Sequence, residues 1–379
     1  MKIKKICIIL CIPFCLVSYC IYKNTPIRTA IFRSFVKGNW YLISEKDTLY
    51  SFGYYGVKKW LINSSNKLKL LEENKDFCNN TYIGYLIGRS GVINNDYLYL
   101  ASRSYLGGND SVSTSGYING KLLILKKNNL KILKEIPSDI KFTDIKIFKN
   151  HLFVSGLKGF DIYEILKPDS LDLIYKYRQN EFTEFQGITF FQKDSCTFIA
   201  FARFAEGISI WDITNPPKTH EVKKINIPNM LSCTSGNSNG LQCFDIEYKA
   251  PYLYISLAPM IYTFNKKNDK RGVITCDISD FNNIKYYFSP IAKKDWYKKK
   301  IGDPEPSYID IYKNKLYTNF GEKGIAIFDI SNPSKPRYEG IIDITNNNNL
   351  IQPIHINHRG ILFAGDYYWP DIYSKQLND

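Results

Sequence analysis

The chain has 379 residues, of which 44% are hydrophobic and 15% aromatic, so it can bury a large core and is not a disordered protein. Tyr (29) and Phe (23) are frequent whereas Met (3) is rare, which favours strands over helices. The formal net charge of +14 is compatible with nucleic acid, anionic lipid or an acidic partner, or with a simple compositional bias toward lysine. No nucleic-acid-binding motif accompanies the charge, so nucleic acid is not expected as a partner.

The first 23 residues have the layout of an export signal. Lys2, Lys4 and Lys5 precede an uncharged stretch at 6–22, which Lys23 closes. The segment is compatible with a cleaved signal peptide, with lipidation of Cys20, or with an uncleaved anchor at the lower length limit for spanning a bilayer. Tyr19 departs from the lipoprotein pattern, which has a small residue before the cysteine. All three interpretations place the remainder outside the cytoplasm, in a cell envelope or at a cell surface, and the membrane is expected to be reached only through this segment.

The cysteines agree with an oxidising compartment. Cys233 and Cys243 flank a polar loop rich in Ser, Asn and Gly, which a disulfide could close. The chain has no CxxC pair with matching histidines, so we expect neither zinc nor another metal, and no cofactor.

An internal repeat is the strongest signal in the sequence. Residues 207–216 and 324–333 are almost the same ten-residue phrase, residues 272–280 are a third copy, and residues 159–165 are a looser fourth. Each alternates apolar and polar residues, as a strand does, and the clearest copies end in Asp-Ile-Ser/Thr-Asn-Pro. We interpret Asp212, Asp277 and Asp329 as structural, because an aspartate at a turn accepts hydrogen bonds from nearby backbone amides.

Each copy belongs to a unit of four short antiparallel strands. The units are residues 40–73, 91–136, 143–178, 187–227, 244–289 and 308–343, with a shorter seventh at 354–379. The seventh lacks an outer strand, and residues 28–36 form an orphan strand ahead of the first unit. The sequence therefore predicts an all-β, seven-bladed β-propeller over residues 26–379, monomeric, with four-stranded antiparallel blades and with its last blade closed by the N-terminal strand.

The motif resembles that of the LVIVD-repeat family, whose unit carries Gly-apolar-x-apolar-x-Asp-Ile-Ser/Thr-Asn/Asp-Pro. The match is specific around Asp212, Asp277 and Asp329 and degenerate elsewhere. The resemblance implies a bacterial, surface-associated propeller. It transfers no catalytic residue to this chain.

The predicted connections are unequal in length on the two faces. Tight turns at 149–150, 94–95 and 313–314 join strands one and two of their units. Long segments at 74–90, 102–119, 230–243, 258–271, 289–307 and 345–353 all join strands two and three or link one blade to the next. In an antiparallel blade these long segments share one face, as a grafted binding surface does.

Two groups of residues are candidates for a site. The segment 289–307 places Lys293, Lys294, Lys298, Lys299 and Lys300 around Trp296 and Tyr297, and it is either a grip for an anionic partner or a solvated lysine run. Asp144, Asp245 and His355 lie near the ends of predicted inner strands and either converge on a ligand or simply line the channel with water.

The sequence favours a non-enzymatic interaction module that binds an unknown protein or glycan through its insertion-rich face. The alternative is a propeller-type enzyme for a sugar or lipid substrate, with Asp144, Asp245, Asp303 and Glu305 as its acidic candidates. The sequence offers no nucleophile elbow or phosphate-binding loop for such an enzyme.

Overall fold

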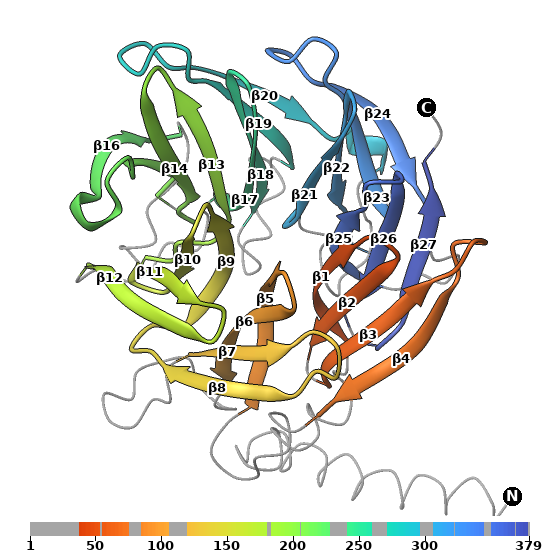
Figure 1. Ribbon diagram of the computed structural model, residues 1–379. Coiled ribbons are helices and arrows are strands. Elements are labelled where there is room, and N and C mark those ends of the chain that lie inside the picture. The colour runs from red at the N-terminus through yellow and green to blue at the C-terminus, as the bar shows by residue number, and fades with distance from the viewer. Residues whose placement is uncertain are drawn as a thin grey trace, which may run out of the picture.

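A computed structural model shows seven antiparallel sheets arranged as blades around a central axis (Figure 1). The first strand of each sheet is innermost and the sheets run outward from it. The structure describes residues 38–53, 55–75, 85–105, 120–179, 183–204, 206–227, 241–259, 271–295, 306–321, 323–344, 350–367 and 369–377.

The strands of each blade follow one another in sequence. They are β1–β4 (Asn39–Glu45, Thr48–Gly53, Gly56–Ile62, Leu68–Asn74), β5–β8 (Tyr85–Asn94, Tyr97–Tyr105, Lys121–Lys126, Ile132–Pro137), β9–β12 (Phe142–Phe148, His151–Gly156, Gly159–Lys167, Ser170–Arg178), β13–β16 (Ile188–Lys193, Cys196–Ala202, Ile208–Asp212, His220–Ile225), β17–β20 (Leu241–Lys249, Tyr252–Pro259, Gly272–Asp277, Lys285–Pro290), β21–β24 (Ile309–Tyr312, Lys315–Asn319, Ile325–Asp329, Arg337–Ile342) and β25–β27 (Ile351–Ile356, Ile361–Asp366, Ile372–Gln376). Within the described residues, two short 3-10 helices, η1 (Pro216–Lys218) and η3 (Lys293–Asp295), lie in connections.

The seven predicted units are confirmed as seven blades. Six sheets have four strands, and the last has three among the described residues. Residues 28–36, predicted as the closing strand, lie outside the described residues, so that strand stays a prediction.

The tight turns between first and second strands follow from residues that tolerate a left-handed backbone. Lys46, Asn95, Lys149, Asp194 and Lys313 have φ between 50° and 55° at these turns. One turn position was wrong by a residue: the β5–β6 turn falls at Asn95 and Asp96, because Asn94 still pairs with Tyr97.

The Asp-Ile-Ser/Thr repeat has the structural role expected of it. The backbone N–H groups of Thr214, Ser279 and Ser331 donate to Oδ1 of Asp212, Asp277 and Asp329, at 2.8, 3.0 and 2.9 Å respectively. The isoleucine after each aspartate is buried and packs toward the preceding blade. The motif therefore shapes the outer turn and adds an apolar side chain to the interface between blades.

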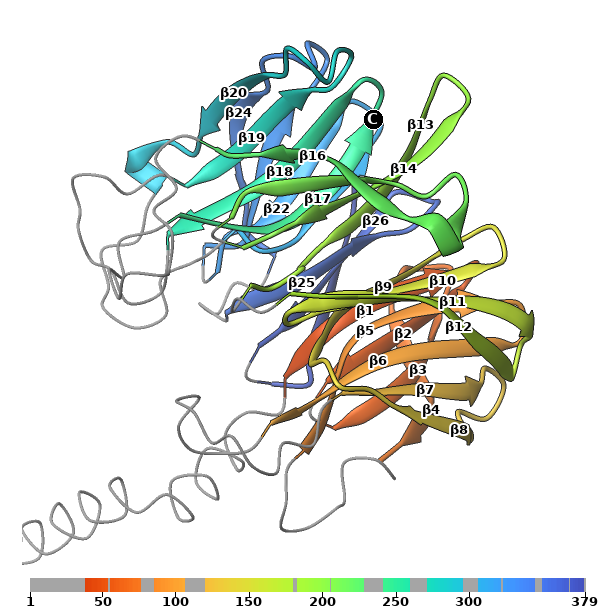
Figure 2. The same ribbon diagram turned by 90° about the vertical axis from the view of Figure 1, so that its left-hand side faces the viewer.

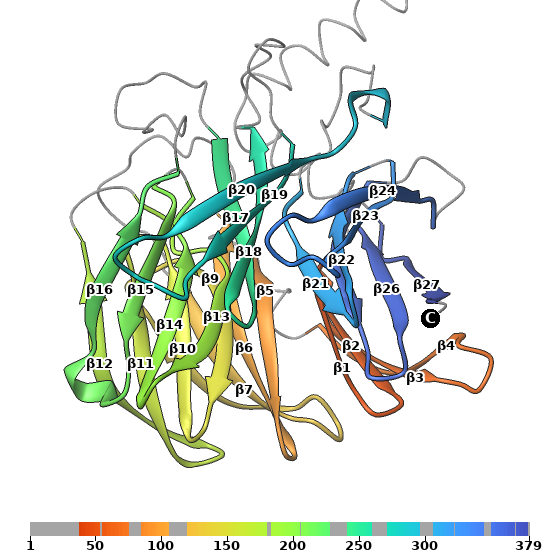
Figure 3. The ribbon, with the colours of Figure 1, turned by 90° about the horizontal axis from the view of Figure 1, so that it is seen from above.

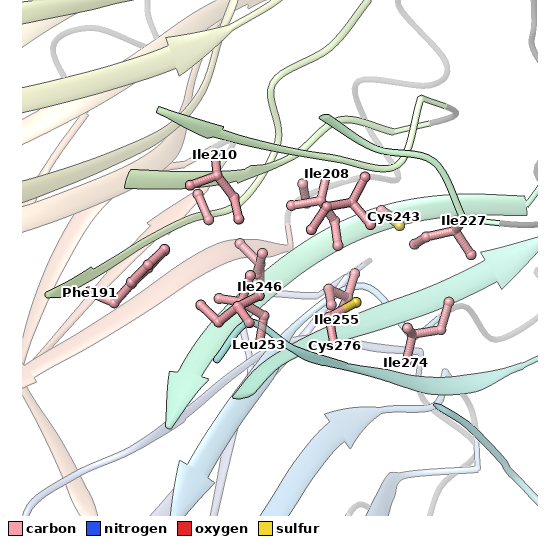
Figure 4. Packing of buried hydrophobic residues seen from close by; sticks show 14 of the residues in the cluster. Phe191, Ile208, Ile210, Ile227, Cys243, Ile246, Leu253, Ile255, Ile274 and Cys276 are labelled. Carbon is pink, nitrogen blue, oxygen red and sulfur yellow. The ribbon is translucent and has the colours of Figure 1, made fainter. Parts of the chain in front are cut away.

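Seven apolar clusters form the core, one between each pair of neighbouring blades. In the cluster between the fourth and fifth blades, Ile208 and Ile210 face Ile246, Ile255 and Cys276 (Figure 4). Both faces of a sheet are thus covered by its neighbours, so every blade depends on two others.

The last and first blades close the ring side by side (Figures 1 and 3). Their interface buries a small group of side chains, Leu42, Leu49, Ile62, Ile361 and Phe363. Asn39 adds a polar clasp: its Nδ2 donates to the carbonyl oxygen of Asp371 at 2.8 Å, and the Tyr55 hydroxyl donates to its Oδ1. Closure among the described residues therefore comes from packing and from polar side-chain contacts such as those of Asn39, without a shared strand.

The two faces of the ring differ as predicted, although the long segments are shorter than expected. The strands continue further into them: β5 begins at Tyr85, β6 reaches Tyr105, β17 begins at Leu241 and β25 begins at Ile351. Gly88 and Ser90 are typical of loops, but here they flank a bulge in β5, and the pairing of β5 with β6 continues on both sides of it. We call the face with these connections the long-connection face and the opposite one the turn face; the side view in Figure 2 shows β17–β20 and β1–β4 at opposite ends of the ring.

Gly38 tests the closing seam. A Cβ on this residue would lie 1.8 Å from the carbonyl oxygen of Tyr367, and a backbone atom cannot move aside cheaply. We expect Gly38→Ala to lower the free energy of unfolding by about 3 kcal/mol, measured by urea unfolding.

Gly340→Ala is the matched control for this substitution. Its Cβ would meet nothing within 4 Å, although its φ of +147° is unfavourable for alanine. We expect a smaller loss of about 1–2 kcal/mol there, from backbone strain alone, and an equal effect of the two variants would contradict the tight closure at Gly38.

Candidate functional site

The inner strands bring a group of charged side chains to the centre of the ring. Asp144 and Lys146 lie on β9, Asp245 and Glu247 on β17, Asp310 on β21 and His355 on β25. Nζ of Lys146 lies 3.0 Å from Oε1 of Glu247, which joins the third blade to the fifth and passes over the inner strand of the fourth. These six residues are called the channel cluster below.

The predicted residues Asp144, Asp245 and His355 therefore come together, and the sequence reasoning missed Lys146, Glu247 and Asp310. A signal for two of them was present. Lys146 and Glu247 stand two residues after Asp144 and Asp245, and residues two apart on a strand point to the same side.

The three channel aspartates bind backbone amides of the next blade. Oδ2 of Asp144 accepts the N–H of Ile188 at 3.0 Å, and Oδ2 of Asp245 accepts that of Ile309 at 2.9 Å. Oδ2 of Asp310 accepts the N–H of Ile356 at 2.7 Å. In each case Oδ1 accepts the N–H of the residue that follows the aspartate. These carboxylates therefore tie one inner strand to the next.

His355 makes the corresponding link across the seam between the last and first blades. Its Nε2 lies 3.1 Å from the backbone nitrogen of Ser44, which donates to it, and 2.7 Å from the Ser44 hydroxyl oxygen. An Nε2 that accepts an N–H carries no proton, so the ring proton is on Nδ1, 3.7 Å from Oδ2 of Asp310. Burial lowers the pKa of His355 to about 4, and the imidazole is neutral at neutral pH.

Burial moves the channel carboxylates in the opposite direction. It raises the pKa of Asp245 and of Asp310 to about 7 and also raises that of Asp144. Burial alone would lower the pKa of Lys146, but Glu247, Asp144 and Asp245 raise it above its ordinary value. The channel can thus hold protons on carboxylates near neutral pH, while Lys146 stays charged.

In the part of the chain that the structure describes, no group of three His, Cys, Asp or Glu residues is arranged to bind a metal ion. The channel aspartates direct their oxygens to backbone amides. Their geometry indicates a structural role in lining the channel. The only chemistry that this geometry supports directly is the gain or loss of protons by these carboxyl groups.

The predicted basic segment is described only at its beginning. Lys293 and Lys294 lie on η3 and are exposed. Next to them, Asp295 accepts a hydrogen bond from the Tyr338 hydroxyl at 2.8 Å, which fixes η3 to the sixth blade. Trp296, Tyr297, Lys298, Lys299 and Lys300, and the acidic candidates Asp303 and Glu305, lie outside the described residues.

Arg203 stabilises another part of the long-connection face. Its side chain is 3% exposed, and Nη2 donates to Oε1 of Gln179 at 2.9 Å and to Oε2 of Glu206 at 2.5 Å. Its guanidinium lies over the Phe185 ring, 4.8 Å from the centroid. The link between the third and fourth blades is therefore held in place by a buried cation.

The remaining sequence predictions concern residues that are not described. Cys243 is buried between the fourth and fifth blades, but Cys233 lies outside the described residues, so their disulfide stays a prediction. Cys20 and the apolar stretch 6–22 also lie outside them. Within the described part of the chain, no helix has the length and apolarity needed to cross a bilayer.

Comparison with known proteins supports the fold alone. No family model matches the chain, and neither does any curated protein. Among solved structures, the chain is similar to the WD40 domain of Neurospora crassa Pan2, at 8% identity and a TM-score of 0.58 over 90% of each chain. It is also similar to the periplasmic gluconolactonase PpgL of Pseudomonas aeruginosa, at 9% identity and a TM-score of 0.56 over 89% of this chain and 88% of that one. The computationally designed Ika8 protein matches at 9% identity and a TM-score of 0.52, over 90% and 98%.

His355 predicts an acid-dependent loss of stability. Its pKa falls from 6.5 in the unfolded chain to about 4 in the folded one, so its contribution is complete above pH 6.5 and is lost as the pH falls toward 4. Asp310 and Ser44 face the ring. Glutamine keeps an acceptor for Ser44 but binds no proton, so His355→Gln should gain stability relative to wild type, by about 2 kcal/mol, between pH 7.5 and 4.5.

Urea unfolding at the two pH values measures this gain, and the comparison cancels the opposite effect of the aspartates, which both proteins share. His358→Gln is the control, because His358 is exposed at the turn face. A pH-independent difference between His355→Gln and wild type would show that protonation of His355 does not weaken the seam.

Proposed function

We propose that the chain is an exported, membrane-tethered, non-enzymatic interaction module that binds a protein or glycan through its long-connection face. The observation that carries this proposal is the confinement of the long connections to one face. The connections β4–β5, β6–β7, β16–β17, β18–β19, β20–β21 and β24–β25 all attach there, whereas the opposite face has tight turns between first and second strands. Loops grafted on one side of a rigid frame are a common way to build a recognition surface.

Hydrogen bonds of buried or partly buried side chains hold the frame beneath this surface where it is described. Tyr338 holds Asp295 of η3 on the sixth blade, and Arg203 holds the link between the third and fourth blades. A binding surface whose supports are fixed loses less conformational entropy when a partner binds. This favours recognition by the face as a whole.

Export and tethering are supported by the sequence of the first 23 residues, with its lysines followed by an uncharged stretch. The resemblance of the Asp212, Asp277 and Asp329 motifs to LVIVD repeats supports the same location. Whether the tether is a lipid on Cys20 or an uncleaved anchor is part of the proposal and is decided by mass spectrometry of the mature N-terminus.

The test is affinity capture from the envelope and secreted fractions of the source cell, with residues 24–379 as bait. A second bait carries Ser in place of Lys293, Lys294, Lys298, Lys299 and Lys300. Because the basic segment offers cations beside two aromatic rings, we expect the second bait to lose most of the captured partner.

A third bait serves as the control and loses five lysines elsewhere, at Lys69, Lys134, Lys218, Lys223 and Lys375. It should capture as much as wild type. If both variants lose the captured partner equally, the loss is due to net charge and not to the basic segment. If all three baits capture the partner equally, the basic segment is not part of the binding surface. Capture of nothing specific would overturn the interaction module itself.

An enzyme is the second candidate, favoured by one observation. Burial brings the pKa of Asp245 and Asp310 to about 7, where a carboxyl group exchanges protons efficiently at neutral pH. A sugar or lipid substrate would have to reach these groups and displace the backbone amides that they bind. Turnover of sugar or lipid esters that is abolished by Asp245→Asn, with folding intact by circular dichroism, would establish this alternative.

A further inference from the structure

The turn face carries a group of lysines over the first three blades. Lys46, Lys67, Lys126, Lys131, Lys149 and Lys167 are all exposed there, in the turns between strands or at strand ends beside them. We call these six residues the turn-face patch. None of them forms a salt bridge with another described residue, so their charges are available to a partner.

The acidic side chains on this part of the face are fewer, and two of them are neutralised. Oε2 of Glu45 lies 2.6 Å from Nζ of Lys127, and Oδ1 of Asp47 lies 3.1 Å from Nη1 of Arg359. Asp96, Asp169 and Asp172 are exposed, and Glu164 is partly exposed opposite His151. The patch therefore has a modest excess of positive charge, six lysines against these four carboxylates.

Two of these lysines occupy positions where the backbone favours other residues. Lys46 and Lys149 have φ of 50° and 54°, in the left-handed region where Gly, Asn or Asp cost less. The equivalent turns of the second and fourth blades use Asn95 and Asp194.

The position of the last blade relates the patch to the N-terminal tether. The strand β27 runs toward the turn face, where Asn66, beside Lys67, donates from its Nδ2 to Oε1 of Gln376 at 3.0 Å. Asn66 also accepts a hydrogen bond from the Ser374 hydroxyl through its carbonyl oxygen, at 2.9 Å. No described strand pairs with the outer edge of β27, which is where the predicted strand 28–36 would lie.

A strand antiparallel to β27 that leads into β1 has a fixed direction. It must start at the turn face and end at the long-connection face, where Gly38 packs against Tyr367. Residue 28 would then lie on the turn-face side of Gln376, because nine residues extend beyond the five of β27. Only four residues separate it from Lys23, and they span at most about 14 Å when extended.

We propose that the turn-face patch lies on the anionic lipid surface of the membrane that holds the tether, so that the long-connection face projects away from the bilayer. This inference rests on the membrane tether of the proposed function and adds an orientation to it. Each lysine near an anionic bilayer surface is worth roughly a fivefold gain in affinity, so six are enough to hold a tethered domain flat. The two faces then divide the work between attachment and recognition.

The test is hydrogen–deuterium exchange on the full chain, reconstituted in vesicles of phosphatidylcholine alone or mixed with phosphatidylglycerol. We expect slower exchange in the turns 46–47, 63–67, 127–131 and 149–150 only when phosphatidylglycerol is present, and loss of this protection in high salt. Residues 28–36 should be protected together with β27 in both kinds of vesicle.

A variant with Gln in place of Lys46, Lys67, Lys131 and Lys149 should lose the lipid-dependent protection. The control variant replaces Lys134, Lys158, Lys223 and Lys323 by Gln, which removes the same charge from other surfaces and should keep the protection. Circular dichroism and thermal unfolding establish that both variants fold.

The outcomes separate this inference from the proposed function. A chain that floats with vesicles but shows unprotected turns, or protection at the long-connection face instead, overturns the orientation and leaves the tether standing. A chain that floats with neither kind of vesicle overturns both. If the patch variant and the control variant lose the protection equally, the protection depends on overall charge, and the proposal that the turn-face patch binds the membrane is wrong.

Discussion

The structure depends on one constraint: every sheet has two apolar faces, and both must be covered by neighbouring sheets. Seven clusters of buried side chains meet this requirement around the ring. An open row of blades would leave an apolar face at each end, so the hydrophobic effect closes the ring. The polar inner strands add to closure, since Asp144, Asp245 and Asp310 each bind a backbone amide of the following blade and His355 accepts one from Ser44.

This arrangement separates what the fold needs from what remains open to variation. The tight turns at Lys46, Lys149 and Lys313 are held to one backbone conformation, because two adjacent strands meet there without slack. The connections on the other face join strands that are already held by their neighbours, so their length and composition affect stability little. The sequence of these connections, and with it the partner that is recognised, can therefore change without changing the ring.

Most of the fold could be predicted from the sequence, because it is carried by local signals that repeat. Alternating residues mark the strands, and the Asp-Ile-Ser/Thr phrase marks the outer turns around Asp212, Asp277 and Asp329. The boundaries were less predictable: Gly88 and Ser90 are typical of a loop, yet they belong to a strand whose partner holds them. Tertiary pairing overrides local preference at such positions.

The channel cluster could be predicted only in part. Asp144, Asp245 and His355 were recognised by their place near strand ends, but the pair formed by Lys146 and Glu247 joins residues 101 positions apart. Which blade faces which across the axis follows from the closed ring, and no local pattern contains that information. The bonds from the aspartates to the next blade were equally invisible, since backbone amides carry no sequence signal.

The seam between the last and first blades also has a mechanical consequence. A pull transmitted along the chain from the N-terminal segment is first taken by the predicted strand at 28–36, and once that strand separates from β27 the pull reaches Gly38, directly beside Asn39 and its bonds to the last blade. The load is then applied at one end of a small interface, as in peeling, where bonds break one after another. A domain held in flowing or crowded surroundings would fail first at this seam, and blades two to six would carry little of the strain.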